Sequence, residues 1–392
     1  MKRSSLFTGK RPERLLLAVA AAAGAVVALA APATGGTAAP EAAARAPAGT
    51  WKLLPAAPVT KLPDRVASVW TGKQMIIRGT RWANPGIMRR VTFAYDPAAS
   101  SWAMLPRGPR PPVTEGQDVA VWTGSQMLLI GPTSAAYTPA TSTWQPIPRP
   151  DLGGPPSSIA AWTGHEAIVW GGTCCAGTTR AGALYNPATG TWRTIQAPFQ
   201  SRAGVEGAWT GTELVLAGGW AGPPGGGGLK DGAAYNPATG QWRLIPVMPR
   251  REGNAVAVWD GTEILFLGGN RPGASGPPNQ GLAFNPATNT WRKLPAMAYP
   301  RTRFAAVWTG HQLLEWGGLT GTYANPVLPP HGEAYNPATN QWTALPASPL
   351  HGRAVATAVW TGHSMIVWGG WAPNGNTTTP YLDGASYTPT NP

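Results

Sequence analysis

The residues of this sequence best suited to bind a ligand are arginines and aromatic side chains in its most variable segments. The arginines stand a few residues before a recurrent Trp-Thr-Gly motif, and the aromatic residues stand in long segments between the repeats. A guanidinium group can hold a carboxylate with two hydrogen bonds, and an exposed indole can stack on a sugar or a peptide. The predicted ligand-binding residues are Arg202, Arg353, Arg301, Arg303, Trp220 and Trp371.

Each of these side chains also has a purely structural interpretation. The arginines could be solvated or paired with carboxylates nearby in the sequence, such as Asp64, Glu115 and Glu252. Each aromatic residue could pack only against its own loop. The sequence leaves both interpretations open.

The only two cysteines, Cys174 and Cys175, are adjacent. Neighbouring Cα atoms lie about 3.80 Å apart, which is below the usual span of a disulfide. We expect a strained vicinal disulfide outside the cytoplasm, where disulfides persist. Free thiols or an intermolecular bond are the alternatives.

The histidines do not predict a metal site. Three of the five follow the Trp-Thr-Gly motif directly and are expected in turns, namely His165, His311 and His363. The other two, His331 and His351, lie in no motif, and two histidines cannot complete a site unless folding supplies further ligands. We therefore predict no metal, no cofactor and no catalytic residue.

Glu315 interrupts a pattern of apolar residues that fill the same position in the other repeats. A lone buried carboxylate is costly unless it is paired. We therefore expect an arginine partner for Glu315 in preference to a catalytic role.

Elements that would position these residues recur along the chain. The motif tryptophans run from Trp70 to Trp360 in six intervals covering 290 residues, a mean near 48 residues. Each motif is followed by a short apolar run, a variable segment, a Tyr-x-Pro or Phe-x-Pro turn, and a second Trp. Runs of this length and composition are typical of β-strands, and periods of this length indicate solenoids or propellers. Each repeat is expected to form a four-stranded antiparallel sheet.

The order of apolar strand, Gly-Gly, Tyr and Trp resembles the kelch repeat over about residues 50 to 392. Five repeats carry the diglycine, at Gly171-Gly172, Gly218-Gly219, Gly268-Gly269, Gly317-Gly318 and Gly369-Gly370. The resemblance implies an all-β, seven-bladed kelch-type β-propeller of the galactose oxidase-like superfamily. In related propellers, arginines at the mouth of the channel receive acidic peptides or polar ligands. The copper of galactose oxidase needs two His, two Tyr and a Cys fused to one Tyr, and we do not transfer that chemistry to this chain.

The last Tyr-x-Pro turn, at Tyr387, has no following Trp because the chain ends at Pro392. Residues 50 to 54, TWKLL, match the start of a fourth strand but have no first three strands before them. We predict that Trp51 supplies the outer strand of the last blade and closes the propeller.

The first 30 residues combine basic residues, an apolar run and Ala28-Leu29-Ala30, the layout of a secretory signal peptide. We expect a signal peptide at 1–30, a disordered Ala/Pro leader at 31–49 and the propeller at 50–392, in a secreted, extracellular protein. An uncleaved anchor is the alternative, and only then is the membrane a partner. The net charge is +13, but the arginines are scattered, which argues against nucleic acid.

The predicted function is a secreted binding module for a protein, peptide or glycan on the variable-loop face. This reading disfavours an enzyme. The alternative is a carbohydrate-active enzyme, a sugar isomerase or oxidase, on the same scaffold. A convergent acid/base or metal cluster at the channel mouth would distinguish the two, since a fold does not by itself define a function.

Overall fold

The computed structural model describes residues 49–60, 65–84, 87–109, 118–131, 133–150, 152, 156–171, 180–221, 227–271, 273–322, 325–374 and 377–390. Within these ranges the regular elements are all β-strands, and none is a helix of the length and apolarity that a membrane span requires. The predicted signal peptide (1–30) lies outside the described residues. So does the predicted leader (31–49), apart from Gly49, which already belongs to the first strand.

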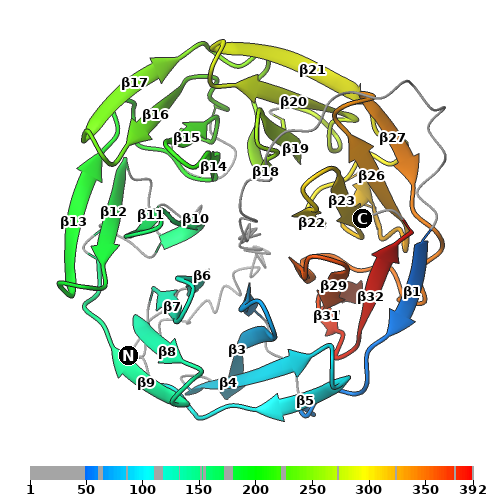
Figure 1. The fold of residues 1–392 in the computed structure, drawn as a ribbon. Coiled ribbons are helices and arrows are strands. Elements are labelled where there is room, and N and C mark those ends of the chain that lie inside the picture. The colour runs from blue at the N-terminus through cyan, green and yellow to red at the C-terminus, as the bar shows by residue number, and fades with distance from the viewer. Residues whose placement is uncertain are drawn as a thin grey trace, which may run out of the picture.

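Seven four-stranded antiparallel sheets stand in a circle, each running from the centre of the molecule to its rim (Figure 1). We number these blades 1 to 7 along the chain. The innermost strands are β2 (Arg65–Trp70), β6 (Val119–Trp122), β10 (Pro156–Trp162), β14 (Glu206–Trp209), β18 (Gly253–Trp259), β22 (Ala305–Trp308) and β28 (Thr357–Trp360). The second strands are β3 (Met75–Asn84), β7 (Met127–Ile130), β11 (Ala167–Gly171), β15 (Leu214–Ala217), β19 (Ile264–Asn270), β23 (Leu313–Trp316) and β29 (Met365–Trp368).

The third and fourth strands complete the blades. The third strands are β4 (Ile87–Asp96), β8 (Ala135–Thr138), β12 (Ala181–Asn186), β16 (Gly232–Asn236), β20 (Gln280–Asn285), β26 (Gly332–Asn336) and β32 (Gly384–Pro389). The outer strands are β5 (Ser101–Met104), β9 (Thr143–Pro146), β13 (Thr191–Gln196), β17 (Gln241–Ile245), β21 (Thr290–Ala296), β27 (Gln341–Ala344) and β1 (Gly49–Leu53). Two short hairpins extend the loops of blades 6 and 7, formed by β24 (Thr320–Gly321) with β25 (Pro326–Val327), and β30 (Trp371–Asn374) with β31 (Thr377–Pro380).

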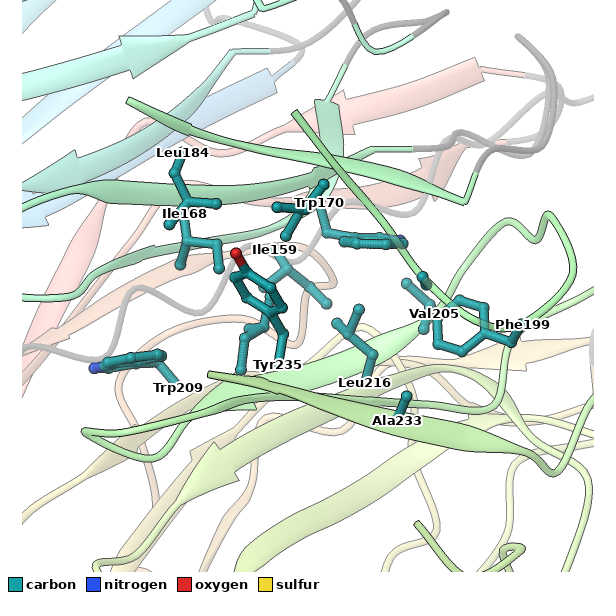
Figure 2. Close-up of a cluster of buried hydrophobic side chains, with 13 residues drawn as sticks. Ile159, Ile168, Trp170, Leu184, Phe199, Val205, Trp209, Leu216, Ala233 and Tyr235 are labelled. Atoms are coloured by element: carbon teal, nitrogen blue, oxygen red, sulfur yellow. The ribbon is translucent and has the colours of Figure 1, made fainter. Parts of the chain in front are cut away.

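The core lies between the blades. The buried apolar residues of the described chain form seven clusters, and each cluster joins one pair of neighbouring blades. Figure 2 shows the cluster between blades 3 and 4, where Trp170 and Ile168 face Leu216 and Tyr235. A single sheet cannot hide both of its faces, and the circular arrangement buries each face against the next blade.

Blade 7 is closed by β1 from the start of the chain, and the prediction for Trp51 is confirmed. Strand β1 pairs with β32 so that Trp51 stands opposite Tyr387. Their ring centroids lie 5.1 Å apart, close to the 4.9 Å between Tyr235 and Trp242 in blade 4. In Figure 1 the two strands lie side by side at the right of the circle.

The outer tryptophans also tie each blade to its neighbour. The indole Nε1 of Trp51 donates to the carbonyl of Pro346, which follows the outer strand of blade 6. Trp102 of blade 1 makes the same bond to Pro55, which follows β1. The same indole-to-carbonyl hydrogen bond therefore links neighbouring blades on both sides of the blade in which β1 pairs with β32.

The diglycines allow the blades to approach one another at the ends of the second strands. Gly317 and Gly318 both have positive φ, 74° and 92°, a region that suits glycine. A Cβ on Gly317 would lie 2.7 Å from the carbonyl oxygen of Arg353 in blade 7, and one on Gly318 would lie 2.7 Å from that of Thr302 in blade 6. The first glycine thus leaves room for the backbone of the next blade, and the second leaves room for the segment that begins its own blade.

Candidate functional site

The starts of the innermost strands and the ends of the second strands share one face, which we call the loop face. Antiparallel pairing places Glu206, the first residue of β14, opposite Ala217, the last residue of β15. The segments linking one blade to the next reach the centre of the molecule on this face. Any site at the mouth of the central channel must therefore be built from these links.

One position in four successive links has a left-handed backbone. It lies five residues before the motif Trp and has φ between 57° and 61°, at Gly204, Asn254, Arg303 and Val355. Backbone bonds join these positions across neighbouring blades, from the Asn254 N–H to the Gly204 carbonyl and from the Val355 N–H to the Arg303 carbonyl. We call this row of residues in blades 4 to 7 the channel mouth. Strained backbone of this kind is often found at functional sites.

Three of the predicted arginines do not reach solvent. Arg202, Arg301 and Arg353 are each 0 % exposed. In each, Nη1 donates to the carbonyl of the first glycine of the diglycine 16 residues later, at 3.0 to 3.2 Å. It also donates to the carbonyl of the residue directly before the third strand, which is Asp231, His331 or Asp383. These side chains fasten the base of the loop between the second and third strands.

Carboxylates complete the bonding of these arginines. Asp231 lies 2.6 Å from Nη2 of Arg202, and Asp383 lies 2.5 Å from Nη1 of Arg353. These predicted ligand-binding arginines are therefore buried, and Arg202 and Arg353 pair with carboxylates other than Asp64, Glu115 and Glu252, which the sequence suggested. Arg303 differs because it lies in the channel mouth itself and is half-buried.

The two predicted tryptophans lie on the loop face, and both are half-buried. Trp220 forms backbone bridges to Ala203 and Gly228. Its indole packs so closely on Gly253 that a Cβ there would overlap it. Trp371 begins β30 and bridges to Ala354. Both retain partly exposed rings for stacking, and their role in ligand binding stays a prediction. Cys174 and Cys175, with the predicted vicinal disulfide, lie outside the described residues.

Glu315 has the arginine partner expected from the sequence. Its Oε1 lies 3.0 Å from Nε of Arg301, and both side chains are 0 % exposed. Blade 6 has His331 at the position where blades 4 and 7 have an aspartate. Glu315 supplies the missing carboxylate from the second strand, with Glu333 as a more distant partner of Arg301 at 3.5 Å. The interruption in the apolar pattern is thus explained by the structure of this blade.

Burial raises the pKa of Glu315 to about 8, with Arg301 acting in the opposite direction and Glu333 adding to the rise. The folded state therefore binds this proton more tightly than the unfolded state. The corresponding stability is fully present below about pH 4.5 and is lost as the pH rises through about 8.

We expect the free energy of unfolding to fall between pH 5 and pH 8, and Glu315→Gln to flatten that fall because it removes the proton equilibrium. Denaturant unfolding across this pH range measures the effect. The matched control is Glu213→Gln, which removes a surface partner of Arg243 and should keep the wild-type slope. An unchanged slope in Glu315→Gln would contradict the assignment.

A second pair of buried carboxylates lies at the channel mouth, between blades 4 and 5. Glu206 and Glu252 are 2 % and 0 % exposed. Oε1 of Glu206 accepts the N–H of Ala255 at 2.9 Å, and Oε2 of Glu252 accepts Nε of Arg250 at 2.7 Å. The remaining oxygens, Oε2 of Glu206 and Oε1 of Glu252, have no hydrogen-bond partner.

Burial raises the proton affinity of both carboxyl groups. Burial raises the pKa of Glu252 to about 7, while Arg250 opposes the rise. Burial also raises the pKa of Glu206 well above its usual value, and the charge of Glu252 adds to that rise. The pKa of Glu252 thus lies near neutral pH, and burial favours the protonated form of Glu206. Neighbouring carboxyl groups with shifted pKa values are a common arrangement for general acid–base chemistry.

Glu206 was not among the residues predicted from the sequence, although it interrupts the pattern of the other repeats. Glu206 stands three residues before the motif Trp, where the other repeats have Ala67, Val119, Ile159, Val256, Ala305 and Thr357. Glu252 stands seven residues before it, where blades 4, 6 and 7 have arginine. The comparison of repeats that identified Glu315 also identifies both of these residues.

The described residues contain no group of three or more His, Cys, Asp or Glu placed to hold a metal. His331 stacks on Tyr299 at 5.4 Å and His351 on Tyr381 at 6.3 Å, in two separate pairs on blades 6 and 7. These histidines support loops through their backbone carbonyls, which accept from Arg301 and Arg353.

Comparisons with known proteins bear on the fold. No protein-family model matches the sequence, and no curated protein matches it. Among solved structures, a fungal alcohol oxidase of the AA5 family, determined in complex with copper, is similar with a TM-score of 0.66 and 16 % identity. The match covers 87 % of this chain and 76 % of that one. At this identity the likeness concerns the fold alone, and it supports a seven-bladed propeller of the galactose oxidase-like kelch type.

The prediction that the chain is primarily a binding module is contradicted. The similar solved structure is that of an enzyme, and three of the arginines on which the prediction depended are buried. The alternative given by the sequence, an enzyme on the same scaffold, agrees better with these observations.

Proposed function

We propose that this chain is a secreted carbohydrate-active enzyme that works by proton transfer, as a sugar isomerase does, with Glu252 as the base and Glu206 as the acid. The observation that carries the proposal is the buried pair of carboxyl groups at the channel mouth, each with one oxygen free of hydrogen bonds.

The raised proton affinities of the two carboxyl groups suit the two roles. A general base works best when its pKa is near the working pH, and Glu252 has a pKa of about 7. Isomerisation of a sugar requires removal of a proton next to a carbonyl group and return of a proton to the neighbouring carbon. Glu252 would remove the proton from the carbon next to the carbonyl group and later return it to the neighbouring carbon. Glu206, whose protonated form burial favours, would give its proton to the carbonyl oxygen and then take up the proton of the neighbouring hydroxyl group.

The surroundings of the pair suit a sugar. Trp220 packs over Gly253, the residue that follows Glu252, and it exposes part of an indole on which a sugar ring can stack. Asn254, also in the channel mouth, contributes a half-buried amide. Because both carboxyl groups are buried, a substrate reaches them only after the Trp220 indole shifts away from Gly253.

An oxidase is the second candidate, and the similarity to the AA5 alcohol oxidase favours it. Its copper chemistry would need a set of metal ligands, and the described residues contain no group of three or more His, Cys, Asp or Glu placed to hold a metal. The two candidates differ in what they consume, because an oxidase takes up oxygen and an isomerase does not.

The test is to incubate the protein with a panel of aldoses, ketoses and uronic acids in deuterated water, with and without added copper. We expect deuterium to enter the carbon next to the carbonyl, without oxygen uptake. Glu252→Gln and Glu206→Gln should each lower the rate about 100-fold or more, whereas Glu213→Gln should not change it. Oxygen uptake that requires copper would select the oxidase instead, and neither reaction on any sugar would contradict the enzyme proposal.

A further inference from the structure

An exposed arginine of the link to blade 5 lies beside the Trp220 indole. Arg251 directly precedes Glu252, and its Nη1 donates to the carbonyl of Gly228 in blade 4. Gly228 is also the residue that forms a backbone bridge with Trp220. The same short segment of blade 4 therefore holds both the indole and the guanidinium group.

The sheet of blade 5 places a second exposed arginine, Arg271, near the same indole. Arg271 directly follows Asn270, the last residue of β19, and Asn270 pairs with Gly253 in β18. The Trp220 indole packs on Gly253. Arg271 also lies close enough to Glu252 for its charge to lower the pKa of that carboxyl group, against the larger effect of burial. Two exposed cations, one indole and the proposed base thus share one part of the loop face.

The carboxylates in this part of the loop face have other arginines as their direct partners. Glu252 pairs with Arg250 at 2.7 Å, and Asp231 pairs with Arg202 at 2.6 Å. In the part of the chain that the structure describes, neither of the two exposed arginines forms a direct ion pair with a carboxylate. A guanidinium group has five N–H donors, so both keep donors that face solvent and can hold an anion from solution.

We propose that the substrate of this site is a uronic acid whose carboxylate is held by Arg271 and Arg251 beside Trp220, an inference that rests on the proposed function. A guanidinium group holds a carboxylate with two hydrogen bonds, and the half-exposed indole stacks on the sugar. A hexuronic acid carries its carboxylate at the opposite end of the carbon chain from its aldehyde. The carboxylate therefore stays at the exposed arginines while the aldehyde end reaches the buried pair, Glu206 and Glu252.

The test compares sugars that differ in the charged group alone. Glucuronate, galacturonate and their methyl esters are titrated into the protein by calorimetry at constant ionic strength. We expect each uronate to bind about tenfold more tightly than its ester, because the ester keeps the shape of the sugar and loses the charge. Arg271→Met should lower the affinity for the uronates about fivefold, as expected for one exposed ion pair, and leave that for the esters unchanged. Arg271→Lys should restore part of the loss.

Arg107→Met is the matched control, because Arg107 is an exposed arginine after the outer strand of blade 1 and its loss changes the net charge equally. It should bind both uronates like the wild type. The inference is overturned by uronates that bind no more tightly than their esters, or that bind Arg271→Met as tightly as the wild type, or that do not bind at all.

Binding requires no turnover, so these outcomes are separate from the deuterium exchange that tests the enzyme. Exchange into neutral sugars, without preference for uronates, would reject the uronic acid and leave the proposed function intact. Binding of uronates that depends on Arg271, without exchange into any sugar, would reject the enzyme and leave the recognition of the carboxylate.

Discussion

A chain that begins at Pro55, and so lacks β1, is expected to lose most of its stability and to aggregate. The deletion removes Trp51, which packs on Tyr387 and on Trp316 of blade 6. Large-to-small changes at such aromatic positions cost about 3–5 kcal/mol. It also leaves the outer edge of β32 unpaired, while the other edge still pairs with β29, and an unpaired edge is a template for aggregation.

Substitutions within β1 separate the contribution of the side chain from that of the strand. Trp51→Ala should lower the free energy of unfolding by about 3–5 kcal/mol, measured by denaturant unfolding. Lys52→Ala on the same strand is the control, because Lys52 is exposed and should change stability little. If the shortened chain were as stable and as soluble as the longer one, some other element would have to close the circle.

The second large effect is expected from Arg301→Ala, at a residue first predicted to bind ligand. The substitution removes the partner of the fully buried Glu315. It also leaves the carbonyls of Gly317 and His331 without their donor. Breaking a buried ion pair by removing one member typically costs about 3–5 kcal/mol. We expect a loss of that size in the free energy of unfolding at pH 9, where Glu315, with a pKa of about 8, is ionised beside Arg301.

A double-mutant cycle tests whether the loss comes from the stranded carboxylate. Combining Arg301→Ala with Glu315→Leu should recover part of the stability, since no buried charge then remains without a partner. Arg243→Ala is the control, because its side chain is 35 % exposed and exposed ion pairs contribute only about 0.2–1 kcal/mol. A loss below 1 kcal/mol in Arg301→Ala would mean that the arginine does not hold the loop in place.

The second prediction assigns a structural role to an arginine of the loop face. In blades 4, 6 and 7 an arginine fastens the loop base, whereas blade 5 has Glu252 at that position. There Arg250 donates to the carbonyl of Gln280 and pairs with Glu252. The exception in blade 5 places a carboxylate next to Glu206, and this difference between blades creates the proposed site.

The sequence by itself determined the number of blades, the order of strands and the closure by Trp51. These features follow from short-range patterns that recur along the chain, such as the Tyr and Trp seven residues apart at Tyr235 and Trp242. Each pattern specifies one hairpin or one turn, so its meaning does not depend on distant residues. Pairing with an arginine was also predictable for Glu315, because burial of a lone carboxylate is so costly.

Only the tertiary structure decided which way the polar residues of the loop face are directed. Arg202 and Arg353 point inward because carbonyls 16 and about 30 residues later converge on them, and local sequence does not show that convergence. Glu206 and Glu252 interact because the link of blade 5 docks on blade 4, where the N–H of Gly219 donates to the carbonyl of Glu252. Contacts between blades depend on the closed circle, so the proposed site emerges only when all seven repeats are assembled.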